Sequence, residues 1–367
     1  MMTNSISMIS RRLKRFYESM ESHGWDAALI TGKGNLRYFT DFRLNRVASA
    51  ILVIPRAGEA FYFVAKLDFE RAKRDCPNFE VISFPEDTPS YLDGLGQIIG
   101  GNTIRHLAIE SNLLYQQARY INKLLPEAAF FFLDETLLKF RAIKDLEEIA
   151  RLRKAAQIAD RAMTGVIQQV AVGKTELELV GLAKLLFAQE GGEDESFEPF
   201  LMSGENAWLP QRVATDRTIR EGELIIFDMG TIYRGYCSDL TRTFSLGVLT
   251  SEQKKVYQIA LAAQQKAIEA IRPGIEAQEI DKVARSYIEE RGFGRFFPHL
   301  TGHGIGVEDH EEPIIDQGNT LLLEENMVLT IEPGLYVPGV GAARLEDMVL
   351  VTPEGAELLT SAPKESM

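Results

Sequence analysis

Short apolar runs alternate with helical patterns over the first 140 residues. Apolar side chains recur at helical spacing across Ser10–His23, and the run Asp26–Thr31 that follows is typical of a strand. Turn residues bound four more short apolar runs, which predict strands at Ala50–Ile54, Ala60–Val64, Leu107–Ile109 and Ala128–Leu133. This alternation indicates a compact α/β domain over residues 1–140. Its histidines, His23 and His106, are isolated, so we expect no catalytic group there.

A domain boundary is expected near Phe140–Asp145, where a long helix with an apolar stripe begins. The stripe comprises Leu146, Ile149, Ala150, Leu152 and Ala156. Beyond it the order of elements repeats: helices and β-hairpins up to about 248, then helices from about 251 to 292 and strands at about 326–351. The repeat predicts a second domain over residues 141–367, with two halves that each bring ligands to one shared site.

Composition and charge narrow the class of protein. The chain has 367 residues, of which 45% are hydrophobic and 25% charged, as in ordinary globular proteins. Its net charge of −13, with both signs interspersed, argues against nucleic acid as a partner. The two cysteines, Cys76 and Cys237, form no C-x-x-C pair, and therefore predict neither a disulfide framework nor a thiolate zinc site.

The sequence also bears on localisation. Charged residues interrupt the N-terminal segment throughout, which is not typical of a secretory signal. No segment approaches the roughly 20 apolar residues of a membrane helix. We therefore expect a cytoplasmic protein with no membrane partner.

Two aspartates mark a predicted β-hairpin. Asp228 ends the apolar run Leu224–Phe227, and Asp239 opens the return strand. A carboxylate that ends such a run is expected to be buried, and a buried carboxylate needs a partner. For Asp228 alone, a hydrogen-bonded aspartate that opens a turn remains an alternative. Two carboxylates that face each other repel unless a cation lies between them, so the pair favours a metal site.

Three of the five histidines, His299, His303 and His310, lie close together among several glycines. Glycine lets the backbone approach a crowded site. A tight turn with hydrogen-bonded imidazole rings is the structural alternative. The clustering favours a functional group of histidines.

Two glutamates interrupt apolar runs further along the chain: Glu332 in MVLTIEPGLY and Glu346 in ARLEDMVLV. A buried glutamate is costly without a partner, and for Glu346 an ion pair with Arg344 is the alternative to a metal. The four carboxylates and one imidazole together form an oxygen-rich set. Such a set suits two divalent ions of the manganese, cobalt, zinc or iron range.

These motifs carry a family resemblance that covers nearly the whole chain. The sequence resembles the pita-bread metallopeptidases, the family of aminopeptidase P, prolidase, methionine aminopeptidase and creatinase. The family pattern of Asp-x-Gly, SD-x-TRTF, GHG-x-G, EPG and R-x-ED is matched at Asp228, Asp239, His303, Glu332 and Glu346. The segments NLRYFTDF, SDLTRTF and RLED resemble the proline-specific branch. The resemblance implies an α+β fold, with a creatinase-like N-terminal α/β domain followed by a pseudo-two-fold pita-bread catalytic domain.

The resemblance also implies an activity. We expect hydrolysis of an Xaa-Pro bond, in a dipeptide or at the N-terminus of a short peptide, by a hydroxide that bridges two divalent ions per chain. Manganese or cobalt is favoured, with the metals held by Asp228, Asp239, His303, Glu332 and Glu346, of which Asp239 and Glu346 are the expected bridges. A homodimer formed through the N-terminal domain is also implied.

Further roles follow from the same resemblance. Glu332 would also carry the proton from the nucleophile to the leaving nitrogen. His310 would stabilise the tetrahedral intermediate, and His299 would help to place the substrate. Arg344 would support the site from behind the metal ligands.

One position departs from the family pattern. Where prolidases and aminopeptidases P commonly have a histidine on the proline side of the substrate, this chain has Gln211, followed by Arg212. Glutamine forms hydrogen bonds but carries no positive charge. Arg212 either serves a substrate carboxylate or is an exposed loop arginine. The departure keeps a second function open, that of a hydrolase or lyase of a small non-peptide metabolite on the same scaffold, as in ectoine hydrolases.

Overall fold

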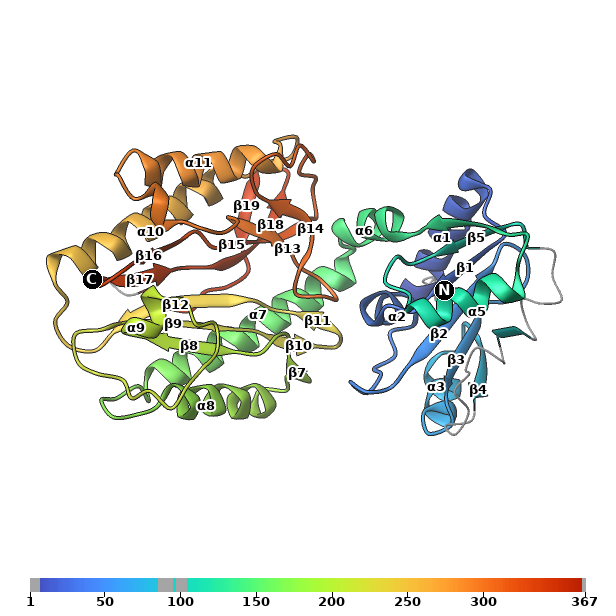
Figure 1. Cartoon of the computed structure of the whole chain (residues 1–367), viewed down its shortest axis with the longest axis horizontal. Helices are drawn as coiled ribbons and strands as arrows, with labels where there is room; N and C mark the ends of the chain where they lie inside the picture. Colours follow the sequence, from blue (N-terminus) through green and yellow to red (C-terminus); the bar gives the residue numbers. More distant parts are fainter. Residues whose placement is uncertain (1–6, 85–94, 97–103, 365–367) are drawn as a thin grey trace, which may run out of the picture. The chain divides into compact units, whose positions relative to one another are not determined.

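The computed structural model describes residues 7–84, 95–96 and 104–364. The chain divides into two compact units, Met1–Lys139 and Phe140–Met367, which are described separately below (Figure 1). None of the helices in the described ranges combines the length and the apolar character that crossing a membrane requires.

The N-terminal unit is built on a six-stranded mixed sheet with the order β4-β3-β2-β1-β5-β6. Its strands are β1 (Ala27–Ile30), β2 (Ala50–Pro55), β3 (Phe61–Ala65), β4 (Glu80–Phe84), β5 (His106–Ile109) and β6 (Ala129–Phe132). Strands β1, β2 and β3 pair antiparallel, whereas β4, β5 and β6 join in parallel. The sequence pattern predicts all of these strands except β4, which lies at an edge and buries little of its surface.

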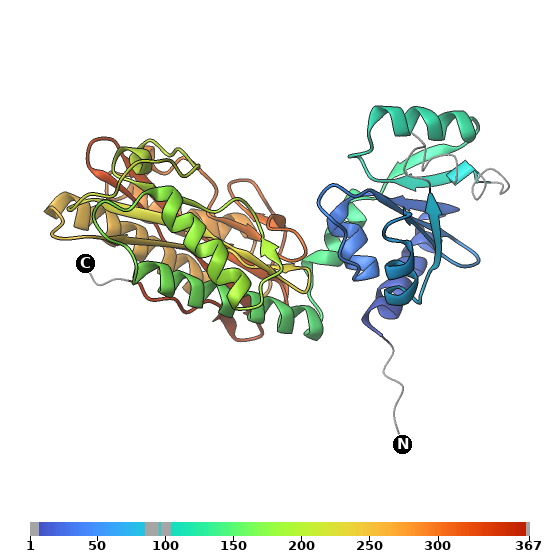
Figure 2. The same ribbon diagram turned by 90° about the horizontal axis from the view of Figure 1, so that it is seen from below.

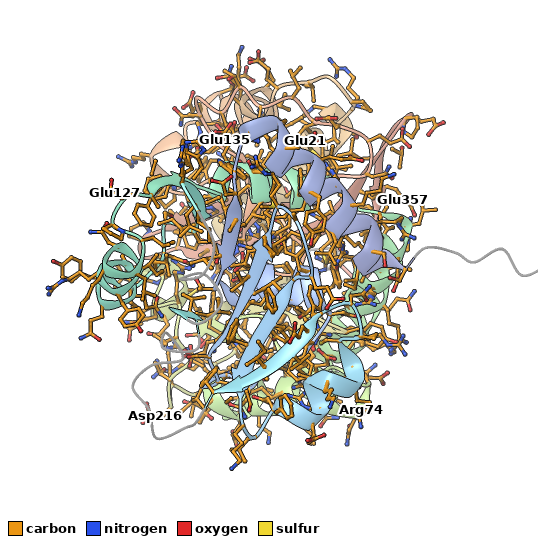
Figure 3. All side chains as sticks on the ribbon, turned by 90° about the vertical axis from the view of Figure 1, so that its right-hand side faces the viewer. Glu21, Arg74, Glu127, Glu135, Asp216 and Glu357 are labelled. Atoms are coloured by element: carbon orange, nitrogen blue, oxygen red, sulfur yellow. The ribbon has the colours of Figure 1, made fainter. Side chains whose placement is uncertain are left out.

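Helices cover both faces of this sheet: α1 (Met8–His23), α2 (Lys33–Thr40), α3 (Phe69–Asp75) and α5 (Tyr115–Leu124). Figure 2 shows α5, in teal, on one side of the sheet and the blue helices α1 and α2 on the other. The hydroxyl of Ser7 caps α1 by accepting a hydrogen bond from the backbone N–H of Ser10, and α1 ends at Gly24 with φ +70°. The helix buries its predicted apolar face and exposes Glu21, labelled in Figure 3.

The second unit, Phe140–Met367, carries the candidate catalytic residues and is called the catalytic unit below; it repeats one arrangement, two helices followed by an antiparallel sheet (Figure 1). The first half has α7 (Leu146–Ile167) and α8 (Glu176–Gln189), then the sheet of β8 (Phe200–Ser203), β9 (Leu224–Met229) and β12 (Leu240–Ser245). The second half has α10 (Ser251–Ala270) and α11 (Ala277–Glu289), then the sheet of β13 (Gly302–Gly304), β14 (Glu311–Ile315), β15 (Val328–Ile331), β18 (Asp347–Thr352) and β19 (Gly355–Leu358). The repeat confirms the predicted pseudo-two-fold organisation.

Smaller elements complete the unit. Strands β7 (Asp194–Glu195), β10 (Thr231–Tyr233) and β11 (Tyr236–Cys237) form a small sheet, and β16 (Gly334–Val337) pairs with β17 (Gly341–Arg344). A short helix, α9 (Glu205–Trp208), and a 3₁₀ turn, Gly294–Phe296, lie in the connections.

Each half of the unit buries its core between its helices and its sheet. In the first half Phe227 and Met229 of β9 pack with side chains of α7 and α8, and in the second Leu329 and Ile331 of β15 pack with those of α10 and α11. The helices lie outside the strands in Figure 1. Alternate side chains of a strand point to opposite faces, so the residues between these core positions face away from the helices.

The long helix predicted to begin near Phe140–Asp145 is α7, which starts at Leu146. A short break separates it from the preceding helix, α6 (Asp134–Ala142). Asp145 caps α7 by accepting hydrogen bonds from Glu147 N and Glu148 N, both at 2.9 Å, while the Glu148 side chain accepts one from Asp145 N. This reciprocal cap stabilises a helix start and therefore interrupts the helical pattern. Leu146, the first residue of the predicted stripe, is 82% exposed.

Candidate metal centre and active site

The five candidate metal ligands come from both halves of the catalytic unit, and most of them lie where a strand begins or ends. They are Asp228 in β9, Asp239 before β12, His303 in β13, Glu332 after β15 and Glu346 before β18. The polypeptide changes direction at these places, so a side chain there need not follow the alternating directions of the side chains along the strand.

Asp228 faces away from the helices because Phe227 and Met229, its neighbours in β9, are both buried in the core. Its partner across the antiparallel pair is Thr241, not Asp239. The hairpin of β10 and β11 intervenes between the two aspartates. The predicted simple hairpin with facing aspartates is therefore wrong in its register, although both aspartates reach the same site.

His303 lies on a strand where the backbones are unusually close. A Cβ atom on Gly302 would lie 1.9 Å from the Thr330 carbonyl oxygen, so only glycine fits there. His303 is 1% exposed, and its Nδ1 donates to the Gly304 carbonyl oxygen at 2.9 Å. This bond leaves Nε2 as the acceptor in the neutral ring. Burial lowers the pKa of His303, but the Glu332 carboxylate outweighs it and holds the pKa above its usual value.

Glu332 and Glu346 each occupy a turn between two strands. Glu332 Oε1 lies 3.2 Å from His303 Nε2 and accepts a hydrogen bond from Thr330 Oγ1 at 3.2 Å. Glu346 Oε2 accepts one from Thr241 Oγ1 at 2.7 Å. Burial raises the pKa of Glu332, but the hydrogen bond and charge of His303 outweigh it and lower the pKa to about 2. Glu332 is therefore ionised at neutral pH.

The ligand atoms fit a divalent cation. One ligand atom each of Asp239, His303 and Glu346 lies within 4.8 Å of the others. Among the described residues, Asp228 Oδ1, Asp239 Oδ1 and Glu346 Oε1 are buried without a hydrogen-bond partner. Burial, followed by repulsion from neighbouring carboxylates, raises the pKa of Asp239 and Glu346 well above the usual range. Unpartnered buried carboxylates are costly, and a cation among them removes the cost.

Arg344 lies beside these carboxylates and is itself buried. Its guanidinium pairs with Asp228, lies 4.0 Å from Glu332 and donates to the Tyr336 hydroxyl at 2.8 Å. The alternative considered from the sequence was an ion pair of Arg344 with Glu346. In the structure Arg344 pairs with Asp228 and Glu332 instead. Arg344 thus fixes the positions of two candidate ligands.

The ligand group opens into a cavity of about 320 Å³. Its apolar wall is formed by Phe197, Phe200, Pro210, Pro298, Leu300 and Tyr336. The sequence pattern does not predict these wall residues, because an apolar side chain that lines a cavity resembles one that lies in a core. A site with an apolar wall and a few charged groups is typical of small-ligand binding.

Two further candidate histidines, His299 and His310, line the cavity. His299 Nδ1 donates to the Leu300 carbonyl oxygen at 2.7 Å, and its Nε2 is buried without a partner among the described residues. Burial lowers the pKa of His299 to about 4, so the ring is neutral near pH 7. His310 stacks on His303 with ring centroids 3.7 Å apart, and its Nδ1 lies 3.3 Å from Asp309 Oδ2.

Gln211 does not lie in the cavity wall. Its side chain is exposed, and its backbone N–H donates to the Asn206 carbonyl oxygen at 3.2 Å. The cavity is instead lined by its neighbours Pro210 and Arg212. The structure therefore brings together the other predicted site residues but leaves Gln211 outside.

Comparison with known proteins identifies the class. Residues 150–353 match the family model of metallopeptidase family M24, and residues 12–143 match that of the Creatinase/Prolidase N-terminal domain. The fold and the site are thus those of a metallopeptidase, an enzyme class that depends on divalent metal ions.

Relatives along the whole chain narrow the class further. The Xaa-Pro dipeptidase of Pyrococcus horikoshii is 35% identical over 360 residues, which cover 98% of this chain and 99% of that protein. The solved prolidase from Pyrococcus horikoshii OT3 has a TM-score of 0.91 and 35% identity, and covers 97% of this chain and 100% of its own. The X-Pro aminopeptidase from Thermotoga maritima has a TM-score of 0.86 and 31% identity, and the match covers 96% of this chain and 99% of that chain. The protein belongs to metallopeptidase family M24, the pita-bread family, in its prolidase branch, and this confirms the predicted family and fold class.

Proposed function

We propose that the protein hydrolyses an Xaa-Pro peptide bond, in a dipeptide or at the N-terminus of a short peptide. The observation that carries the proposal is the group of buried carboxylate oxygens around His303, beside the cavity, that have no hydrogen-bond partner among the described residues. The names of the relatives, Xaa-Pro dipeptidase and X-Pro aminopeptidase, support the same substrate class. The metabolite alternative rests on Gln211, which lies outside the cavity wall, and the relatives named above give it no support.

The proposed cofactor is a pair of divalent ions, which Asp228, Asp239, His303, Glu332 and Glu346 would hold. A ligand set of oxygens and one imidazole suits manganese or cobalt, with zinc and iron as the other members of the range. When bound, the ions would acidify a water and polarise the scissile carbonyl.

The side chains around this site supply the proton transfers. Glu332 is ionised, so it can accept a proton from the attacking water and deliver it to the leaving nitrogen. His310, exposed over the cavity, can donate a hydrogen bond to the oxygen that gains charge in the transition state. His299 keeps Nε2 as an acceptor and can hold an N–H group of the substrate. Arg344 keeps Asp228 and Glu332 in place.

The proposal includes a homodimer formed through the N-terminal domain. Strand β6 forms one edge of that domain's sheet, and its Phe130, Phe131 and Phe132 are 36%, 40% and 70% exposed. An apolar edge strand of this kind is a site for association. We also propose a reducing, cytoplasmic location, which the two free buried cysteines support.

A substrate panel tests the proposed activity. Manganese- and cobalt-loaded protein should cleave Xaa-Pro dipeptides or longer Xaa-Pro peptides, and should leave cyclic amidines intact. Absence of cleavage of every Xaa-Pro peptide, with turnover of a cyclic amidine, would favour the metabolite alternative.

A further inference from the structure

Arg212 brings a positive charge to the cavity wall. It lines the cavity together with Arg344, the guanidinium of which is held by Asp228 and Glu332. No carboxylate among the described residues pairs with Arg212, and its side chain is exposed. The wall therefore carries a cation that is free to bind an anion from solution.

The loop that carries Arg212 is fixed at both ends by one buried carboxylate. Glu176, at the start of α8, is fully buried. At one end of the loop it accepts hydrogen bonds from Ser203 N and Oγ at 2.9 and 2.8 Å and from Asn206 Nδ2 at 3.0 Å. At the other end it accepts them from Thr215 N and Oγ1 at 3.0 and 2.8 Å. Hydrogen bonds to a charged acceptor are the stronger kind, so Arg212 is presented from a closed, anchored loop.

The backbone of Arg212 lies in the left-handed region. Its φ is +54°, a conformation that is less favourable for a residue with a Cβ atom than for glycine. Its N–H donates to the sulfur of Met202, a buried residue of β8, at 3.4 Å. At this turn Arg212 lines the cavity, whereas its neighbour Gln211 does not.

The cavity thus offers two kinds of binding group. The cluster of carboxylate side chains around His303 is proposed to act on the peptide bond. Arg212 is available to bind an anionic end of the substrate. A guanidinium matches a carboxylate with two parallel hydrogen bonds. A volume of about 320 Å³ lies at the lower end of the range of about 300–1,000 Å³ for ligand cavities, which suits a ligand as small as a dipeptide.

We propose that Arg212 binds the C-terminal carboxylate of an Xaa-Pro dipeptide and so makes the protein a dipeptidase rather than an aminopeptidase. This inference rests on the proposed Xaa-Pro hydrolysis and adds the length of the substrate. An aminopeptidase substrate continues beyond proline and carries no carboxylate at that position. Arg212 therefore selects for substrate length, because it binds a proline carboxylate that the longer peptide lacks.

The test compares three peptides on full-length, metal-loaded protein: Ala-Pro, its C-terminal amide, and Ala-Pro-Ala. Wild-type protein should prefer Ala-Pro to the other two. Arg212→Gln should lower kcat/KM for Ala-Pro by about 10- to 100-fold, mainly through KM, because a hydrogen-bonded charge is lost. Activity on the amide should remain unchanged. Arg212→Lys keeps the charge but loses the planar pair of N–H donors, so its kcat/KM for Ala-Pro should lie between those of the wild type and Arg212→Gln.

Arg234→Gln is the matched control. Arg234 is also an exposed arginine with a positive φ, +46°, in the same unit, and it does not line the cavity. This variant should leave the preference among the three peptides unchanged.

Two results would overturn the inference. One is an equal loss on Ala-Pro and on its amide in Arg212→Gln, which would mean that Arg212 acts through the loop. The other is a wild-type preference for Ala-Pro-Ala. Both leave Xaa-Pro hydrolysis standing, whereas a wild type inactive on all three peptides would refute that activity and this inference with it.

Discussion

Replacing Glu311 by glutamine should destabilise the catalytic unit, because Glu311 forms ion pairs with two buried cations, Arg141 and Lys144, beside the active site. Its carboxylate accepts hydrogen bonds from Arg141 Nη2 at 2.6 Å, from Lys144 Nζ at 3.0 Å and from the backbone N–H of Glu308 at 3.1 Å. The side chains of Arg141, Lys144 and Glu311 are each at most 3% exposed. Glutamine has nearly the same shape, so the variant removes charge with little change in volume.

The expected cost is about 3 kcal/mol, at the lower end of the range of about 3–5 kcal/mol for removing one partner of a buried ion pair. The amide oxygen of glutamine still accepts a hydrogen bond, which is why the lower value applies. Since Glu311 directly follows His310, the loop that holds His310 should loosen, and kcat should fall as well.

The pH dependence follows from the pKa of Glu311. Burial raises this pKa, but Lys144 and Arg141 outweigh it and hold it below its usual value of 4.5. A lowered pKa in the folded state stabilises the protein above the usual value, and the stabilisation is lost as the pH falls through the folded-state pKa. The difference in the free energy of unfolding between the wild type and Glu311→Gln should therefore be at its full size near pH 7 and should become smaller in acid.

Urea denaturation of both proteins measures the effect, with the transition of the catalytic unit followed separately because two-domain proteins need not unfold in one step. Glu357→Gln is the control. Glu357, labelled in Figure 3, pairs with Arg153 at 2.7 Å, but the two side chains are 46% and 37% exposed. Loss of an exposed pair costs at most about 1 kcal/mol. An equal, small effect in both variants would refute the reasoning about the buried ion pair.

Three further outcomes are expected. Chelation should abolish peptidase activity, and added manganese or cobalt should restore it; full activity in the chelated protein would contradict the metal site. Asp239→Asn should lower turnover by orders of magnitude with an unchanged circular dichroism spectrum, because it removes a charge that would hold the ions; a wild-type rate would place the chemistry elsewhere. Phe132→Glu should convert a dimer into a monomer in light scattering, since it puts a charge on the exposed edge strand; an unaltered dimer would exclude β6 from the interface.

Local sequence signals were sufficient for some parts of this structure. Apart from β4, the strands of the N-terminal sheet are short apolar runs between turn residues, and each such run forms a strand. Asp228 ends an apolar run, Glu332 and Glu346 each interrupt one, and all three lie in the same site. The start of α7, predicted near Phe140–Asp145, also has a local signal, the Asp145–Glu148 capping box.

Other features depend on contacts between distant segments. Gln211 and Arg212 are adjacent, but only Arg212 lines the cavity. This choice depends on the positive φ of Arg212 and on the hydrogen bonds from the loop to Glu176. The ion pair of Arg344 with Asp228 joins residues 116 positions apart. The apolar wall, with Phe200 and Tyr336, depends in the same way on which elements meet. No local pattern encodes such pairings.

Anomalous X-ray diffraction from a crystal of the manganese-loaded protein tests the central claim most directly. Two manganese peaks per chain are expected beside the cavity, each within bonding distance of members of the set Asp228, Asp239, His303, Glu332 and Glu346. A map with no peak among these side chains, from protein that still cleaves an Xaa-Pro peptide, would contradict it.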